Sequence, residues 1–246
     1  MKAAGLLLLA ALAGGGLAGA AAAATAAADE PPSVNVNSLK NPEMHAYRSV
    51  WAGLDAFEAH HALAPSAPLK FRILRPDGSP VSTADGLALR LAGDNDSVPV
   101  PIGADGLLTI ARDQAAYDAD ATLILNQKAG LFHAWPEIRT PGLPSNVRRL
   151  GDLRLECRVM VAIAKERMSF VAKAALNTLM LGSNWCGRKN MNLAFPVPNG
   201  LESARISHDG RALELTVHEN DYMAPVGDRG WPDDALIALR FAQSGR

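Results

Sequence analysis

The stretch LKFRILRPDG, at residues 69–78, decides how the rest of the chain is organised. Phe71 and Ile73 alternate with charged residues, which is the pattern of a half-buried strand. A Pro-Asp-Gly sequence follows at 76–78. Proline fixes φ, aspartate accepts turn geometry and glycine allows a positive φ. These residues therefore predict a strand that ends in a tight turn.

Short strands separated by turns continue downstream. Alternating or apolar runs follow at 87–91, 98–102, 107–110 and 121–125. Two prolines in the second of these runs remove hydrogen-bond donors, so we expect it at a sheet edge or irregular. Strands this short, with turn signals at intervals of roughly ten residues, are typical of a sandwich. We therefore expect a β-sandwich over 69–155, closed by LGDLRL at 150–155.

The order of these signals resembles the transthyretin-like, carboxypeptidase-regulatory type of β-sandwich. The resemblance rests on the turns and strands at 76–78, 80–81, 104–106 and 107–110, and on the way the stretch closes at 150–153. It implies an accessory module, generally non-catalytic, of the kind found in envelope and secreted proteins. The segment 127–149 departs from the pattern because it is longer and richer in proline, and there we expect a long loop or an extended crossing.

The first residues have the three parts of an export signal. Residues 1–28 carry Lys2, a short apolar run and then a zone of small residues, which together predict a cleaved signal peptide. No cysteine stands at the cleavage zone, so a lipid anchor is not expected. Residues 29–40 read as a flexible leader. The predicted location is the bacterial periplasm or the exterior.

Composition and motifs exclude several function classes. The 246 residues include 24 Lys and Arg and 25 Asp and Glu, for a net charge of −1. Such a balance gives no electrostatic case for nucleic acid or for an anionic membrane surface, and no stable membrane insertion is expected after signal cleavage. The sequence has no phosphate loop, dinucleotide-binding glycine pattern, nucleophile elbow or HExxH motif. We expect no cofactor.

A leading amphipathic helix is predicted over 41–62. Asn41 suits the N-cap and Pro42 the first helical position. One apolar stripe at spacings of three and four follows, formed by Met44, Tyr47, Val50, Trp51, Leu54 and Phe57. The stripe is expected to pack on the β-sandwich.

The two cysteines, Cys157 and Cys186, predict a disulfide, because an even number in an oxidising compartment usually pairs. The segment 157–186 contains a helical stretch at about 161–181, so the bond would pin a helical excursion to the last strand of the sandwich. The region 191–246 returns to short alternating strands, with the strongest hairpin signal at Asp209-Gly210. These strands could form a second small sandwich or extend the first. The chain is thus expected to be mainly β with α additions.

Two sets of residues are candidates for ligand binding. Trp135, Trp185 and Trp231 could build an aromatic platform for a sugar ring, although large aromatic residues also serve as core in β proteins. Four histidines could supply metal ligands: His45, His60, His61 and His218. Adjacent histidines point about 100° apart on a helix, which makes a shared ion awkward. A solvated helix end is the simpler interpretation of the pair.

The prediction for function is an exported, non-enzymatic binding or assembly module that acts on an envelope protein or a cell-wall glycan. No residue is assigned a catalytic role. The alternative is a periplasmic hydrolase or metal-binding protein. It would use the polar cluster of His218, Glu219 and Asp221, or the His60-His61 pair.

Overall fold

The strand and turn predicted at 69–78 are both present. A computed structural model describes residues 40–79, 81, 86–94, 96–169, 172, 184–198 and 200–242, all within one unit, Val34–Arg246. Strand β2 (Leu69–Leu74) buries Phe71 and Ile73, and Gly78 N–H donates to Arg75 O at 2.9 Å to close the turn. The predicted signal peptide, and all of the predicted leader except Lys40, lie outside the described residues.

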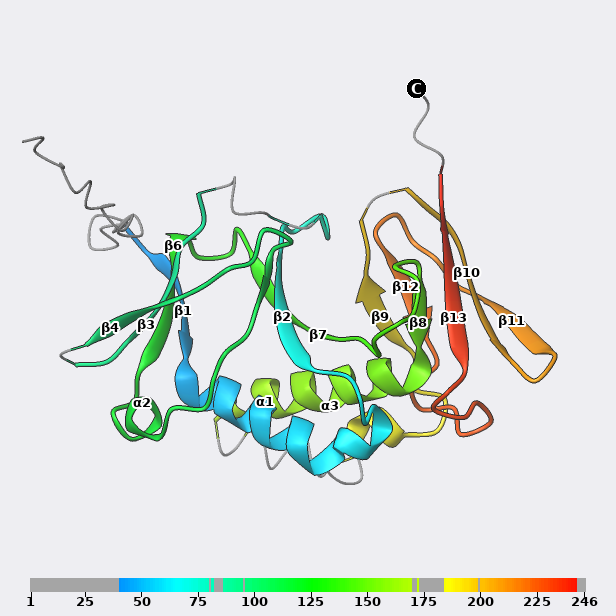
Figure 1. The fold of residues 1–246 in the computed structure, drawn as a ribbon, viewed down its shortest axis with the longest axis horizontal. Coiled ribbons are helices and arrows are strands. Elements are labelled where there is room, and N and C mark those ends of the chain that lie inside the picture. Colours follow the sequence, from blue (N-terminus) through cyan, green and yellow to red (C-terminus); the bar gives the residue numbers. More distant parts are fainter. Residues whose placement is uncertain are drawn as a thin grey trace, which may run out of the picture. The chain divides into compact units, whose positions relative to one another are not determined.

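The N-terminal half has two antiparallel sheets, and β2 is the middle strand of one of them. One has the order β1-β6-β3-β4, from Pro42–Ala46, Thr122–Lys128, Leu89–Ala92 and Ser97–Val100. The other has the order β5-β2-β7, where β5 is Leu107–Leu108 and β7 is His133–Ile138. Figure 1 shows them side by side above the helices α1 (Tyr47–His60) and α3 (Leu150–Glu166). A short helix, α2 (Gln114–Asp118), connects β5 to β6.

The two sheets share one core with the helices. Sheet residues Phe71, Ile73, Leu123 and Leu125 pack there with side chains from both helices, including Tyr47 and Leu155. The predicted turn at 104–106 is also present, and Gly106 has a φ of +73°. A Cβ there would lie 2.0 Å from Val81 O, so this turn requires glycine.

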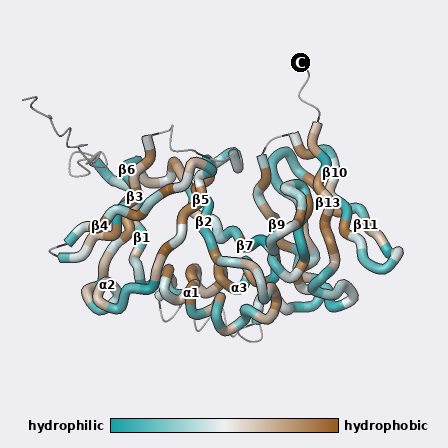
Figure 2. Tube along the Cα trace, viewed as in Figure 1, coloured by the Kyte–Doolittle hydropathy of each residue, from teal (hydrophilic) through white to brown (hydrophobic). Residues whose placement is uncertain are grey.

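The C-terminal strands form sheets that share no strand with the two N-terminal sheets, although one of them takes in β8 from the stretch predicted as the sandwich. A sheet runs in the order β11-β10-β13-β8, from Arg211–Leu215, Leu201–His208, Leu236–Phe241 and Val147–Arg149. Beside it, β12 (Asp221–Ala224) pairs with β9 (Leu193–Pro196). The predicted Asp209-Gly210 turn joins β10 to β11, with both residues at positive φ. Figure 2 shows hydrophobic residues along β10 and β13 and hydrophilic residues at this turn.

The closing strand predicted at 150–155 is wrong, because these residues begin α3. Leu153 and Leu155 lie two apart and therefore fit an alternating pattern as well as a helix. In α3 they serve two cores: Leu150, Leu153 and Cys157 face the C-terminal unit, whereas Leu155 and Val159 face the N-terminal sheets. A helix that buries two faces carries too many apolar residues to show a single stripe.

The start of the predicted leading helix is also wrong. Residues 42–46 form β1, the edge strand beside β6, and α1 begins at Tyr47. Asn41 has a φ of +58° and is not the N-cap, and Met44 is 52% exposed rather than part of the stripe. The pairing of β1 with β6 supplies the backbone hydrogen bonds, so tertiary contacts override the local helix signals. The helix ends at His60 and continues as the 3₁₀ turn η2 (His61–Leu63).

The segment 127–149 is not a loop throughout, since it contains β7 and β8. Pro136 lies in β7, which is the outer strand of its sheet, so the missing N–H leaves no ladder bond unmade. The Trp135-Pro136 pair therefore suggested a loop, although it lies in an edge strand.

The disulfide is confirmed. Cys157 lies in α3 and Cys186 in the 3₁₀ turn η4 (Trp185–Gly187). The helix runs over Leu150–Glu166 instead of beginning near 161, so the bond joins η4 to a helix and not to a strand. Residues 170–171 and 173–183 of the predicted excursion lie outside the described residues. Within the described part of the chain, no helix is both long and apolar enough to cross a membrane.

Candidate functional site

The three candidate tryptophans do not form one platform. Trp231 is only 1% exposed and has the Arg211 guanidinium 4.1 Å from its ring centre. Trp185 lies under the Lys165 ammonium at 5.1 Å, and Trp135 meets the buried ring of Phe195 edge-on at 6.2 Å. Trp231 is therefore a core residue, since a platform must present its ring face to solvent.

The candidate histidines lie on different elements. His61 packs on Phe57 at the end of α1, with ring centres 4.7 Å apart, next to His60. His218 lies on an exposed turn, where its Nδ1 is 2.6 Å from Asp221 Oδ1. Glu219 is exposed on the same turn. Among the described residues, no three His, Cys, Asp or Glu side chains are placed to hold a metal ion together.

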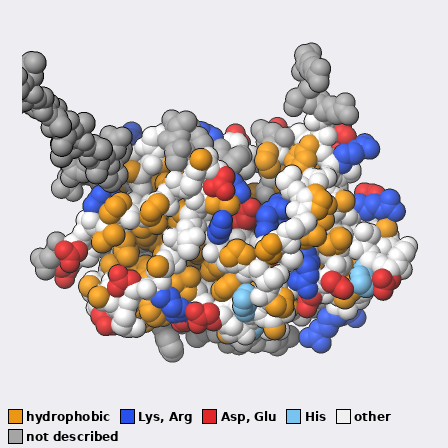
Figure 3. Space-filling model, in the orientation of Figure 1, with side chains coloured by type: hydrophobic (Ala, Val, Ile, Leu, Met, Phe, Trp, Pro, Cys, Tyr) orange, Lys and Arg blue, Asp and Glu red, His pale blue; other side chains and the backbone are white. Residues whose placement is uncertain are grey.

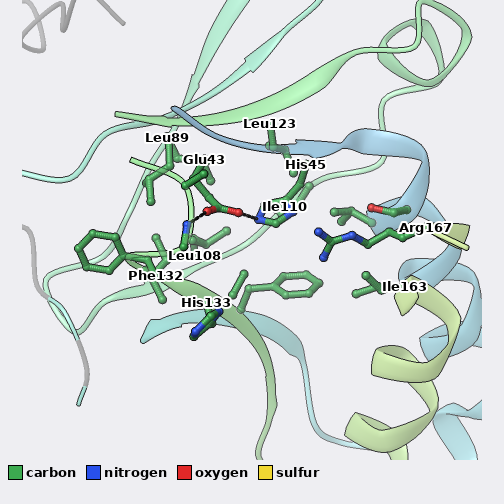
Figure 4. Close-up of a pocket in the computed structure, with 18 residues that line it drawn as sticks. Glu43, His45, Leu89, Leu108, Ile110, Leu123, Phe132, His133, Ile163 and Arg167 are labelled. Carbon is green, nitrogen blue, oxygen red and sulfur yellow. Dashed lines mark hydrogen bonds and ion pairs between the residues drawn. The ribbon is translucent and has the colours of Figure 1, made fainter. Parts of the chain in front are cut away.

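His45, the remaining histidine, lies at a cavity between the two N-terminal sheets. The cavity has a volume of about 430 Å³, within the range of roughly 300–1,000 Å³ that is usual for small-ligand sites. Its walls are mostly apolar. They are formed by Val50, Phe71, Ile73, Leu89, Leu108, Ile110, Leu123, Leu125, Phe132 and Ile163. Figure 4 shows Leu89 of β3, Leu108 of β5, Leu123 of β6 and Ile163 of α3 around the same space.

The close approach of α1 and α3 helps to shape this cavity. A Cβ at Gly53 would lie 2.8 Å from Ile163 Cγ1, so the absence of a side chain lets the two helices pack together. Ile163 then reaches the cavity wall from α3. The same helix brings Arg167, one turn further on, to the cavity.

Glu43, a carboxylate in the cavity lining, already has partners for its oxygens. Glu43 accepts a hydrogen bond from Gly130 N–H at 2.6 Å and lies 2.9 Å from His45 Nε2. Burial, with the positive charge of Arg167 nearby, lowers the pKa of His45 despite its acidic neighbour. The ring is therefore neutral at neutral pH, and both Glu43 oxygens have a partner.

Arg167 is different, because its guanidinium points to the cavity without a partner. Figure 4 shows this side chain extending from the end of α3 toward His45. Within the described residues, no hydrogen bond or ion pair reaches the guanidinium. The cavity thus combines a mostly apolar interior with a solvent-exposed cation that has no protein partner in the described part of the chain.

A serine and a histidine border this cavity but do not form a nucleophile–base pair. Ser49 is 2% exposed, and its hydroxyl donates to Ala46 O at 2.7 Å. No hydrogen bond joins Ser49 to His45 in the described structure. Acyl transfer needs such a contact to activate the hydroxyl, and the Ser49 hydroxyl is instead engaged by Ala46 O.

A second hollow of about 610 Å³ lies between β7 and β9, and Trp135 lines it. Figure 3 shows charged side chains gathered in the middle of this face. On its floor, Arg148 Nη2 donates to Glu156 Oε1 at 2.6 Å, and the same carboxylate oxygen accepts Ile138 N–H at 2.7 Å. One turn earlier on α3, Asp152 accepts Thr140 N–H at 2.8 Å. These acids satisfy the outer edge of β7, which accounts for their burial.

This buried pair predicts a pH dependence of stability. Burial raises the pKa of Glu156 from its ordinary value of 4.5 to about 7, although Arg148 opposes the shift. Between about pH 4.5 and 7 the folded state therefore holds a proton on Glu156 that the unfolded state releases. The free energy of unfolding should fall as the pH rises through this range, by up to about 3 kcal/mol. Urea unfolding at a series of pH values measures this. A Glu156→Gln variant should flatten the curve; an equally steep curve in that variant would assign the dependence to other groups.

Comparison of the chain with protein-family models, with curated proteins and with solved structures finds no match. The functional interpretation therefore depends on the geometry of the cavity and on the sequence.

Proposed function

We propose that this chain is an exported, non-enzymatic binding module, and that the cavity between its N-terminal sheets holds the apolar part of a small ligand. The observation that carries the proposal is the cavity itself. Its volume and mostly apolar walls fit a small-molecule site, and a few polar groups stand among the lining residues. A transthyretin-like, accessory role for the sandwich agrees with this proposal.

Export to the periplasm or the exterior is part of the proposal. It is supported by the signal pattern at 1–28 and by the Cys157–Cys186 bond, since disulfides persist in oxidising compartments. The proposal includes an envelope protein or a cell-wall glycan as a further partner, and the Trp135 side of the second hollow is the place to look for a glycan.

The alternative function is a periplasmic hydrolase, and the short His218–Asp221 contact is the observation in its favour. His60 and His61 belong to a different element, at the end of α1. Hydrolysis of a simple ester or glycoside by the wild type, lost in His218→Ala, would favour the enzyme over the binding module.

Filling the cavity should abolish binding of an uncharged apolar ligand. In Leu89→Trp the larger side chain extends from β3 into the cavity, where it competes with the ligand. We expect the affinity for decanol, measured by displacement of a fluorescent apolar probe, to fall by at least about tenfold, which corresponds to about 1.4 kcal/mol.

Leu213→Trp is the matched control, because Leu213 is 51% exposed on the edge strand β11. Its affinity should equal that of the wild type. Circular dichroism must show that both variants remain folded. Equal affinity in the two variants, or no binding by the wild type, would contradict a ligand site between the sheets.

A further inference from the structure

Arg167 is exposed to solvent beside the cavity and has no acceptor among the described residues. Arg167 carries five N–H donors, and within the described residues none of them is used. From Met168 to Leu201 the sequence contains no Asp or Glu. Glu43 does not call for a cationic ligand in the same way, because both of its carboxylate oxygens already have partners.

We propose that the ligand is a single-chain carboxylate, a free medium-chain fatty acid, with its carboxylate on Arg167 and its chain between the sheets. This inference rests on the proposed function, and it adds the chemical class of the ligand. A guanidinium matches a carboxylate with two parallel hydrogen bonds, which gives both energy and orientation.

The position of Arg167 fixes which way the chain runs. The guanidinium lies at the rim beside His45, and the apolar side chains of Ile73, Leu108 and Leu123 line the interior. A carboxylate bound at the rim therefore keeps its charge near water, while the hydrocarbon enters the apolar space. A cavity of about 430 Å³ favours one chain over the paired chains of a membrane lipid.

Comparing an acid with the alcohol of the same chain length tests this assignment. Decanoate and decanol share their hydrocarbon, so the ratio of their affinities reports the head group. Isothermal titration on the full mature chain, at neutral pH and below the aggregation concentration of either ligand, should give decanoate an advantage of about tenfold, as one charge-assisted pair at a half-open site would provide.

Arg167→Gln should remove this advantage and leave the affinity for decanol unchanged. Arg240→Gln is the matched control, because it removes the same charge from the outer face of β13, where Arg240 is 77% exposed and pairs with Glu202. This control should keep the full preference for the acid.

The outcomes separate the two proposals. If neither ligand binds the wild type, the proposed function fails. If both bind the wild type equally, or if Arg167→Gln still prefers decanoate, the cavity binds apolar ligands but the carboxylate assignment is overturned. A dodecyl phosphate that binds more tightly than decanoate and dodecanoate would also overturn it, in favour of a phosphate head group.

Discussion

Replacing Arg148 by Met should lower the free energy of unfolding by about 3–5 kcal/mol in buffer above pH 7. Arg148 is 8% exposed and Glu156 1% exposed, and they meet at 2.6 Å. Methionine fills a similar volume but leaves the Glu156 carboxylate buried without its counter-charge. At lower pH the loss should be smaller, because Glu156 is then protonated in both proteins. Urea unfolding followed by circular dichroism measures the difference.

Two variants test whether the lost charge pair is the cause. The double variant Arg148→Met/Glu156→Leu removes both charges and should recover most of the lost stability, because a well-packed apolar pair can replace a buried ion pair. Arg139→Met, in the same cleft, should cost no more than about 1 kcal/mol, since Glu137 keeps Arg72 as its partner. A double variant as unstable as Arg148→Met would show that the loss comes from packing.

Removing the disulfide should have the second largest effect. The Cys157→Ser/Cys186→Ser variant opens a loop whose ends are 29 residues apart, which corresponds to about 3–4 kcal/mol on the chain-entropy account. Chemical unfolding of the double variant beside the oxidised wild type measures it. The wild type in excess reductant is the control and should unfold at the same denaturant concentration as the variant. A difference below about 1 kcal/mol would indicate that the unfolded chain is already constrained there.

The sequence predicted correctly those features that depend on a few neighbouring residues or on a single pair of cysteines. The turn after β2, the Asp209-Gly210 hairpin and the Cys157–Cys186 bond all depend on residues with one strong conformational or chemical preference. The errors lie where tertiary contacts decide. Residues 42–46 carry good helix-start signals but pair with β6, and residues 150–155 alternate like a strand but begin a helix buried on two sides.

The candidate site was harder to predict than the fold. A search by residue type selected tryptophans and histidines, and only His45 among them borders the cavity. Its walls come from strands far apart in the sequence, so no local spacing reveals them. Arg167 follows Lys165 and Glu166 and is exposed, as this charged run predicts. The sequence does not show that a cavity opens beside the last turn of the helix. Alternation did contain one signal: Glu43 and His45, two apart on an edge strand, share its inner face.

Helix α3 has a consequence for how the whole unit folds and responds. Its side chains complete the core of the N-terminal sheets on one side and that of the C-terminal strands on the other. If either set of strands separates, one face of α3 becomes exposed to water, and the other set still needs α3 to complete its core. We therefore expect the two β units to unfold in a single cooperative transition. A ligand bound between the N-terminal sheets should then also stabilise the C-terminal strands, which do not contact it.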